Sequence, residues 1–232
     1  MKKTVAYISA IVLLVSVLLW SCEKEIENTE PISSENEYFP IVVGNAITYQ
    51  IQEITIDVQS GVNDTLNYQI KERIDALVET TNEFNSYRLE RLYRADTSQE
   101  WTILNIWQIR QYQRRIHKIE ENYEYVRLLT PTQLYDSWDG NRFNVKEENI
   151  CTVEKIQDSL INNTSYNIAY ITHLNQSSLI DKRFSEEQYA KGIGLISKSI
   201  IDVELNIDPN LPWEEKITKG TLFYQNIIAD NE

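Results

Sequence analysis

The sequence predicts a mainly β fold: a large antiparallel meander sheet that curls into a half-barrel or open barrel, with little helix. Apolar and polar residues alternate with a period of two through most of the chain, which is the pattern of strands with one buried face. Turn-forming residues separate these segments, and no heptad pattern is present. A two-sheet β-sandwich is the alternative, because two packed sheets show the same alternation.

The first two strands are expected at residues 47–58 and 66–78. Residues 60–64 (Ser-Gly-Val-Asn-Asp) have turn chemistry, so they predict a hairpin between the two strands. In the first strand the apolar positions change face midway, which we attribute to a bulge at Gln52-Glu53. In the second strand, Glu72 is the single polar residue on the apolar face.

Alternating segments continue along the rest of the chain. Glu120-Glu121-Asn122 predicts a tight turn, and the loop at 130–144 and the Pro209–Pro212 segment interrupt the strands. About ten strands with one apolar face cannot stay flat, because sheets twist, and we therefore expect them to curl over their own core. One polar face also excludes a doubly wound parallel sheet. The further strands are expected at residues 87–94, 101–111, 116–119, 123–129, 151–156, 166–174, 189–207 and 221–228.

The first residues have the features of an export signal. Lys2 and Lys3 precede an apolar run from Val5 to Leu19, which ends at Leu19-Trp20-Ser21-Cys22. A basic start, a short apolar segment and a small residue are typical of a secretory signal. With Cys22 directly after the small residue, the segment resembles the signal of bacterial lipoproteins, although Trp20 is bulkier than that motif usually carries. The resemblance implies cleavage before Cys22 and attachment of acyl chains such as palmitate to that residue.

Two other interpretations of this segment remain open, an ordinary signal peptide with a chance cysteine and an uncleaved membrane anchor. The apolar run of about 15 residues is shorter than the roughly 20 that a membrane-spanning helix needs. We expect three parts: a signal peptide at residues 1–21, a flexible acidic tether at 22–37, and one β-rich domain at 38–232. The expected location is the outer membrane, and the acidic tether slightly favours the cell surface over the periplasmic side.

The charge of the chain limits its partners. The net charge of −13 becomes −15 once Lys2 and Lys3 are removed with residues 1–21. Such acidity argues against nucleic acid as a partner, because binding to phosphates requires basic side chains. The expected partners are the membrane, through the N-terminal lipid, and an envelope protein or glycan.

Three segments resemble a group of uncharacterised β-rich envelope lipoproteins of Gram-negative bacteria. They are Glu37–Tyr49, with its Tyr-Phe-Pro and Gly-Asn, then Trp138-x-Gly140-Asn141, and Tyr189–Ile196. Together they cover about an eighth of the chain. The resemblance implies a β-rich domain attached to an envelope lipid, and it supplies no catalytic residue.

The loop at 130–144 holds the first candidates for a binding site. Asp136 and Asp139 flank Trp138, and two carboxylates beside an aromatic residue are typical of glycosidases. Tyr135 and Phe143 add aromatic surface for a ligand. The competing interpretation is a solvated loop in which Trp138 fills the core.

Motifs of other catalytic sites are missing. The sequence contains no Gly-x-Ser-x-Gly, His-Glu-x-x-His or Cys-x-x-Cys, and we expect no catalytic residue, metal site or cofactor. Cys151 is expected to be a buried, inert thiol. A nucleophilic role would need a histidine beside it, and only His117 and His173 exist.

Two further patterns concern binding and modification. Arg110, Arg114, Arg115 and Lys118 form one basic stretch in an acidic chain, which suits an anionic ligand or, alternatively, pairing with acids on neighbouring strands. Asp-Thr65-Leu and Asp-Ser159-Leu fit an acceptor pattern for O-glycosylation. The leading hypothesis is a non-enzymatic binding or structural module of the envelope. A sugar-active hydrolase using a carboxylate pair and a carrier of an apolar ligand are the alternatives.

Overall fold

The computed structural model describes residues 36–161 and 164–228. The signal peptide at 1–21, Cys22 and the tether up to residue 35 lie outside the described residues. Among the described residues, no helix is long and apolar enough to cross a membrane. The strands are β1 (Ala46–Asp57), β2 (Val62–Thr80), β3 (Phe84–Arg94), β4 (Thr102–Tyr112), β5 (Arg115–Glu120), β6 (Tyr123–Leu129), β7 (Ser137–Asp139), β8 (Ile150–Ile161), β9 (Thr164–Ser177), β10 (Asp181–Ala190), β11 (Gly194–Leu205) and β12 (Ile217–Ile227), with one short helix, α2 (Trp213–Lys216).

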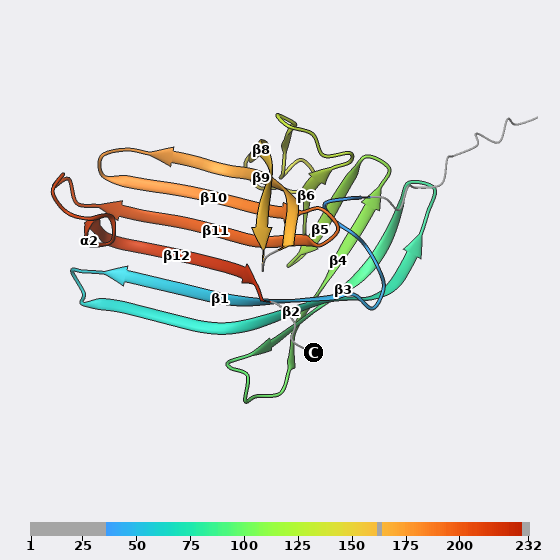
Figure 1. Ribbon diagram of the computed structural model, residues 1–232, viewed down its shortest axis with the longest axis horizontal. Helices are drawn as coiled ribbons and strands as arrows, with labels where there is room; N and C mark the ends of the chain where they lie inside the picture. The colour runs from blue at the N-terminus through green and yellow to red at the C-terminus, as the bar shows by residue number, and fades with distance from the viewer. Residues whose placement is uncertain (1–35, 162–163, 229–232) are drawn as a thin grey trace, which may run out of the picture. The chain divides into compact units, whose positions relative to one another are not determined.

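All twelve strands belong to one antiparallel sheet, in the order β6-β5-β4-β3-β2-β1-β12-β11-β10-β9-β8-β7. Two meanders are therefore joined where β1 pairs with β12. The long strands β10, β11, β12, β1 and β2 run side by side, and β3 to β6 cross them at a steep angle (Figure 1). The sheet nearly closes into a barrel with an unsealed seam between β6 and β7, which confirms the predicted curled meander and excludes the sandwich.

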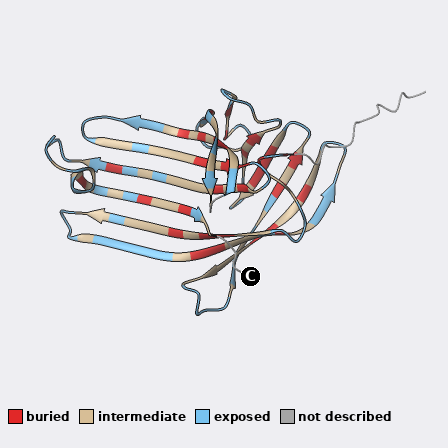
Figure 2. Cartoon of the chain, viewed as in Figure 1, coloured by how far each residue is buried: buried red, intermediate tan, exposed pale blue. Residues whose placement is uncertain are grey.

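Hydrogen bonds at Val126 bridge the seam between β6 and β7. The Val126 N–H donates to the Gly140 carbonyl at 2.9 Å, and the Trp138 indole N–H donates to the Val126 carbonyl at 3.0 Å. The largest core cluster lies beside these bonds and includes Ile116 and Val153, both fully buried. Burial is concentrated where the strands cross, and the strand tips are exposed (Figure 2).

The segment before β1 packs on the turn between β10 and β11. The Gly192 N–H donates to the Glu37 carbonyl at 2.6 Å, and the Phe39 ring lies 6.2 Å from the Tyr189 ring. Gly194 lies against Pro40. Two of the three segments that carried the lipoprotein resemblance therefore contact each other.

The predicted strand at 189–207 is wrong, because the chain turns within it. Residues 191–193 form a turn, and Gly192 has φ of +80°, a conformation that glycine adopts without a steric penalty. β10 and β11 pair on either side of this turn. The expected turn at Glu121-Asn122 is confirmed, since both residues have positive φ.

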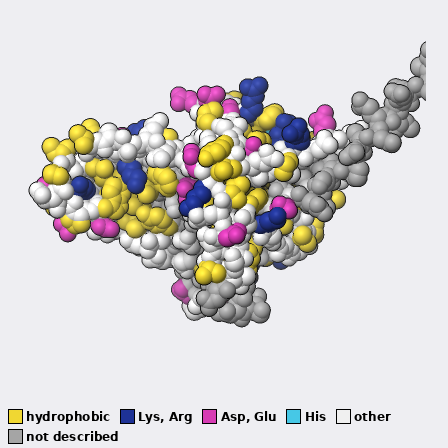
Figure 3. All heavy atoms as spheres, turned by 45° about the horizontal axis from the view of Figure 1, so that its top comes forward, with side chains coloured by type: hydrophobic (Ala, Val, Ile, Leu, Met, Phe, Trp, Pro, Cys, Tyr) yellow, Lys and Arg dark blue, Asp and Glu magenta, His cyan; other side chains and the backbone are white. Residues whose placement is uncertain are grey.

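The predicted bulge at Gln52-Glu53 is also wrong. β1 pairs with β2 and β12 without a register shift, so the apolar residues change face along a regular strand. Tyr49 and Ile51 face the barrel interior. Ile54 packs in a separate cluster with Leu222 and Trp213, the first residue of α2. Hydrophobic side chains also gather on the left-hand part of the molecule in Figure 3, where the long strands project. Ile180, between β9 and β10, and Ile207, after β11, are exposed.

Candidate ligand cavity

The barrel interior contains a cavity of 220 Å³. Its apolar wall comes from the segment before β1 and from strands β1, β2, β3, β4, β10, β11 and β12. Successive side chains of a strand point to opposite faces of the sheet, so only every second residue faces the cavity and each strand contributes few residues. The apolar wall includes Phe39, Ile47, Leu89, Trp107, Leu195 and Phe223.

Seven charged side chains line the same cavity and form an alternating chain of ion pairs. From Arg91 at one end to Lys198 at the other, the nitrogen–oxygen distances between successive members are 3.0, 3.1, 3.9, 2.6, 3.5 and 3.0 Å. The chain begins and ends with a cation, so it holds four cations and three carboxylates. In order, its members are Arg91 (β3), Glu72 (β2), Lys118 and Glu120 (β5), Arg127 (β6), Glu187 (β10) and Lys198 (β11).

Glu187 is the most buried member of this chain, with 3% of its side chain exposed. One carboxylate oxygen lies near Lys198 and Arg127, and the other accepts a hydrogen bond from the Tyr189 hydroxyl at 2.7 Å. Burial alone would raise the pKa of Glu187, but Lys198, Arg127 and His173 outweigh burial and lower that pKa well below its usual value. The carboxylate is therefore ionised inside the barrel.

Arg127 links the two sides of the seam through the interior. It pairs with Glu120 in the first meander at 2.6 Å and with Glu187 in the second at 3.5 Å. Burial opposes the charge on Arg127, but Glu120 and Glu187 outweigh burial and raise its pKa. The pKa of Glu120 is lowered because Arg127, Lys118 and Lys198 outweigh the effect of burial. The Arg127–Glu187 pair therefore joins strands on opposite sides of the seam.

Arg91 and Lys198, the cations at the two ends of the series of ion pairs, have different surroundings. Arg91 donates to Glu72 at 3.0 Å, and its guanidinium stacks 3.8 Å from the centre of the Trp107 ring. Lys198 pairs with Glu187 at 3.0 Å and keeps 21% of its side chain exposed, the largest fraction among the four cations. Lys198 is therefore the cation most available to a ligand.

Cys151 and His173 lie against this chain, on the side of Glu187. The Cys151 sulfur is 3.0 Å from His173 Nδ1, and His173 Nε2 is 3.3 Å from Glu187. This order of groups resembles a nucleophilic triad, but the thiol is buried, and a Cβ at Gly140 would lie only 2.8 Å from its sulfur. Burial, with Glu187 adding to it, raises the pKa of Cys151 to about 12. A protonated, enclosed thiol is not a nucleophile, and the expected buried residue is confirmed.

The five residues nominated in the 130–144 loop differ in their exposure and in their hydrogen-bond partners. Tyr135 is 74% exposed and Phe143 is 47% exposed, whereas Trp138 is buried with its indole bonded to β6. Asp136 accepts the Gln133 N–H at 2.8 Å, and Asp139 accepts the N–H groups of Asn141 and Asn149. Each carboxylate thus stabilises its own turn. A ligand-binding role for the five residues stays a prediction.

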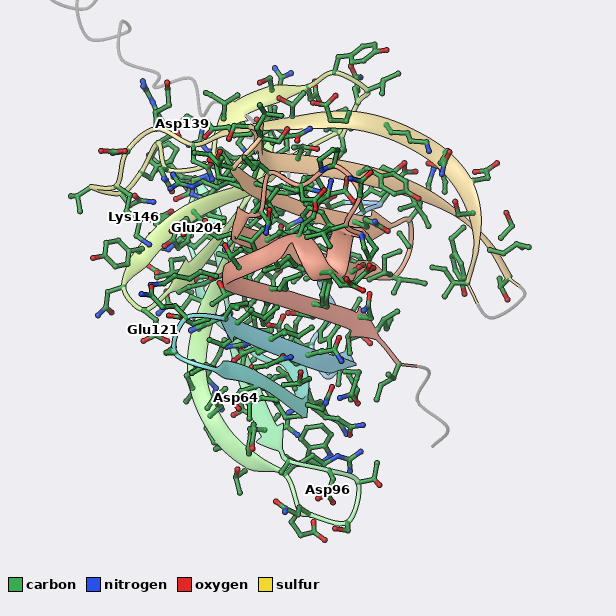
Figure 4. The ribbon with its side chains drawn as sticks, turned by 90° about the vertical axis from the view of Figure 1, so that its left-hand side faces the viewer. Asp64, Asp96, Glu121, Asp139, Lys146 and Glu204 are labelled. Atoms are coloured by element: carbon green, nitrogen blue, oxygen red, sulfur yellow. The ribbon has the colours of Figure 1, made fainter. Side chains whose placement is uncertain are left out.

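Acidic side chains that lie outside the barrel are dispersed. In the end-on view, Asp139 lies at the upper edge of the molecule and Asp96 at the tip of the β3–β4 loop, far from each other (Figure 4). Thr65 is exposed on β2, and Ser159 is partly exposed on β8. O-glycosylation of these two residues stays a prediction.

The basic stretch predicted from the sequence divides between the two faces of β4 and β5. Lys118 faces the cavity, whereas Arg110 pairs with Glu124 at 2.9 Å on the other face. His117 is fully buried there, between the rings of Tyr112 and Phe143, and its Nδ1 lies 2.7 Å from Glu124. Arg110 and Lys118 therefore pair with acids on neighbouring strands, which is one of the two interpretations of the basic stretch.

Sequence reasoning missed the charged chain in the cavity. One signal was present, since Glu72 interrupts the apolar face of its strand. Its partners are 19 and 46 residues away, and no local pattern connects them. Arg127 and Glu187 are 60 residues apart. Only the register of the closed sheet brings these groups together.

No protein family model and no curated protein matches the chain. Among solved structures, the fold is similar to that of a candidate lipoprotein from Parabacteroides distasonis ATCC 8503. The two chains are 11% identical, with a TM-score of 0.43, and the similarity covers 84% of this chain and 98% of the other.

Proposed function

We propose that the chain is a lipid-anchored protein of the outer membrane that binds a small ligand inside its barrel, without catalysis. The observation that supports binding is the cavity of 220 Å³, whose wall combines aromatic and aliphatic side chains with charged side chains held in ion pairs. Ligand sites generally have such walls, with a few convergent polar groups, and measure about 300–1,000 Å³ for drug-sized ligands. The smaller cavity suits a short-chain ligand.

The hydrolase alternative has no comparable support. Asp136 and Asp139 each accept main-chain N–H groups within their own turns. A carboxylate pair that flanks a glycosidic bond would instead face a common space about 5–10 Å across. The carrier alternative is the one that an internal cavity favours.

Binding in the cavity is tested with straight-chain alcohols from butan-1-ol to decan-1-ol, titrated by calorimetry. Each buried methylene contributes about 0.8 kcal/mol, so affinity should rise about fourfold per carbon until the cavity is full, and then stop rising. Ile200 lines the cavity while 36% of its surface is exposed, so it stands where cavity and solvent meet. Ile200→Trp should therefore weaken binding.

Ile207→Trp is the matched control, because Ile207 is exposed and lies outside the cavity lining. It should leave alcohol binding unchanged. Absence of binding by every alcohol, or equal affinity in both variants, would contradict the proposal of an internal ligand site.

Anchoring is tested by Cys22→Ser, which removes the thiol that would accept the lipid. The variant should leave the membrane fraction, while Cys151→Ala should remain in it. Retention of Cys22→Ser in membranes would contradict lipid anchoring. Protease treatment of intact and permeabilised cells then separates surface display from the periplasmic side, since a periplasmic domain is cut only after permeabilisation.

A further inference from the structure

The cavity carries a surplus of positive charge in an acidic protein. Four cations and three carboxylates line it, and the chain that they form ends in a cation at both ends. The whole sequence carries −13, so the interior has the opposite sign to the rest of the molecule. Each cation has a carboxylate partner, but the lining keeps a net charge of one positive unit, which one added anion would neutralise.

The carboxylates among these ion pairs already have cationic partners. Glu72 accepts from Arg91 and from Lys118 through both of its oxygens. Glu187 has Lys198, Arg127 and the Tyr189 hydroxyl around it. A cationic ligand would have to displace one of these partners, whereas an anion would add to the chain.

Lys198 is the end of the series of ion pairs at which an anion can bind. Among the described residues its ion-pair partner is Glu187 alone, whereas Arg91 also lies against Asn105 and the Trp107 ring. An ammonium has three donors. Ile200 and Phe223, which pair across β11 and β12, place apolar surface beside it. A charged headgroup and an apolar chain would therefore find their contacts in the same cavity.

We propose that the cavity binds an amphiphile with a short apolar chain and a single carboxylate, whose headgroup pairs with Lys198. This inference rests on the proposed function and names the class of its ligand. One negative charge matches the surplus of one positive charge. A second negative charge would lack a cation and would face Glu187 across the headgroup.

The test compares octanoate, octan-1-ol, octylamine and octyl phosphate by calorimetry at pH 7.5. Octanoate should bind about tenfold more tightly than octan-1-ol, since each 1.4 kcal/mol of charge pairing is a tenfold change. Octylamine and octyl phosphate should bind more weakly than octanoate.

Two variants then change the charge of the cavity in known directions, and two more serve as controls. Lys198→Met makes the lining neutral and should abolish the preference for octanoate over octan-1-ol, whereas Lys198→Arg should keep it. Glu120→Gln adds one positive charge and should increase the preference. Lys155→Met, on an exposed part of β8 outside the lining, changes the protein's charge equally and should leave the preference unchanged.

Binding of octan-1-ol serves as the check on folding for each variant. If octan-1-ol binds and octanoate binds no more tightly, the carboxylate proposal is overturned while the proposed function stands. If neither binds to the wild-type protein, the proposed function itself fails. Tighter binding of octyl phosphate or octylamine, or an unchanged preference in Lys198→Met, would also overturn the assignment of a monoanion to Lys198.

Discussion

Charged side chains inside this barrel depend on one another. A carboxylate buried as deeply as Glu187 would take up a proton if it stood alone, because desolvation penalises its charge. Here two cations and the Tyr189 hydroxyl surround it, so the charged form is retained. His117 shows the opposite outcome. Burial lowers the pKa of the imidazole and outweighs Glu124, which raises it, while Arg115 and Arg110 lower it further.

The lowered pKa of His117 predicts a pH dependence of stability. As pH falls below about 6.5, the unfolded chain takes up a proton on this histidine and the folded protein does not. The free energy of unfolding should therefore fall toward lower pH, by at most about 1.4 kcal/mol per pH unit, until the folded-state pKa is reached. His117→Gln should lack this contribution.

Urea denaturation of both proteins at pH 7.5 and pH 5.5 measures the effect. Subtracting the two proteins cancels the contribution of every group that titrates equally in both. If the difference in unfolding free energy between wild type and His117→Gln is the same at both pH values, His117 is not held neutral by burial.

At the scale of the element, the seam depends on one short strand. β7 has three residues, and its pairing partner is β8, so little besides Trp138 and one backbone bond joins it to β6. The sequence alternation predicted most of the strands and the turn at Glu121-Asn122, because each depends on neighbouring residues, but β7 and most of β10 were not among the predicted strands. It could not predict where β6 meets β7, since a loop with no periodicity connects them. Trp138, nominated as a ligand residue, holds this seam.

Trp138→Phe should weaken the seam while most of the core packing around this position is retained. The phenyl ring retains part of the packing, but the Val126 carbonyl loses its donor, which costs about 1–3 kcal/mol when a buried group is left unpaired. Amide hydrogen exchange at Val126 should accelerate by more than exchange at Ile171, which lies in the core. Trp213→Phe, in the cluster on the other face, is the control. Equal acceleration at Val126 and Ile171 would indicate that the indole bond does not hold the seam.

At the scale of the whole molecule, the curl of the sheet follows from its sequence and the content of its interior does not. One apolar face on many strands requires a closed or curled sheet. Glu120 and Glu187 were indistinguishable from surface acids in a protein with 35 acidic residues, and Glu72 differed from them by its place on the apolar face of its strand. Their partners come from strands on both sides of the seam, so the charged chain exists only in the nearly closed barrel.

Because Glu187 joins both halves of the barrel, its ionisation should govern acid stability. Its folded-state pKa lies well below the usual value of 4.5, so the stability it provides is complete above that value. This stability is lost progressively as pH falls below 4.5 toward the folded-state pKa. Glu187→Gln should cost about 3–5 kcal/mol at pH 7, because it removes the ion-pair partner of Lys198 and one of the two partners of Arg127, and should lose less stability than wild type between pH 5 and pH 3. Glu204→Gln, at an exposed position of β11, should behave as wild type in urea denaturation across this range. An acid dependence in Glu187→Gln as steep as that of wild type would mean that other carboxylates control unfolding and that the ion pairs across the seam contribute little.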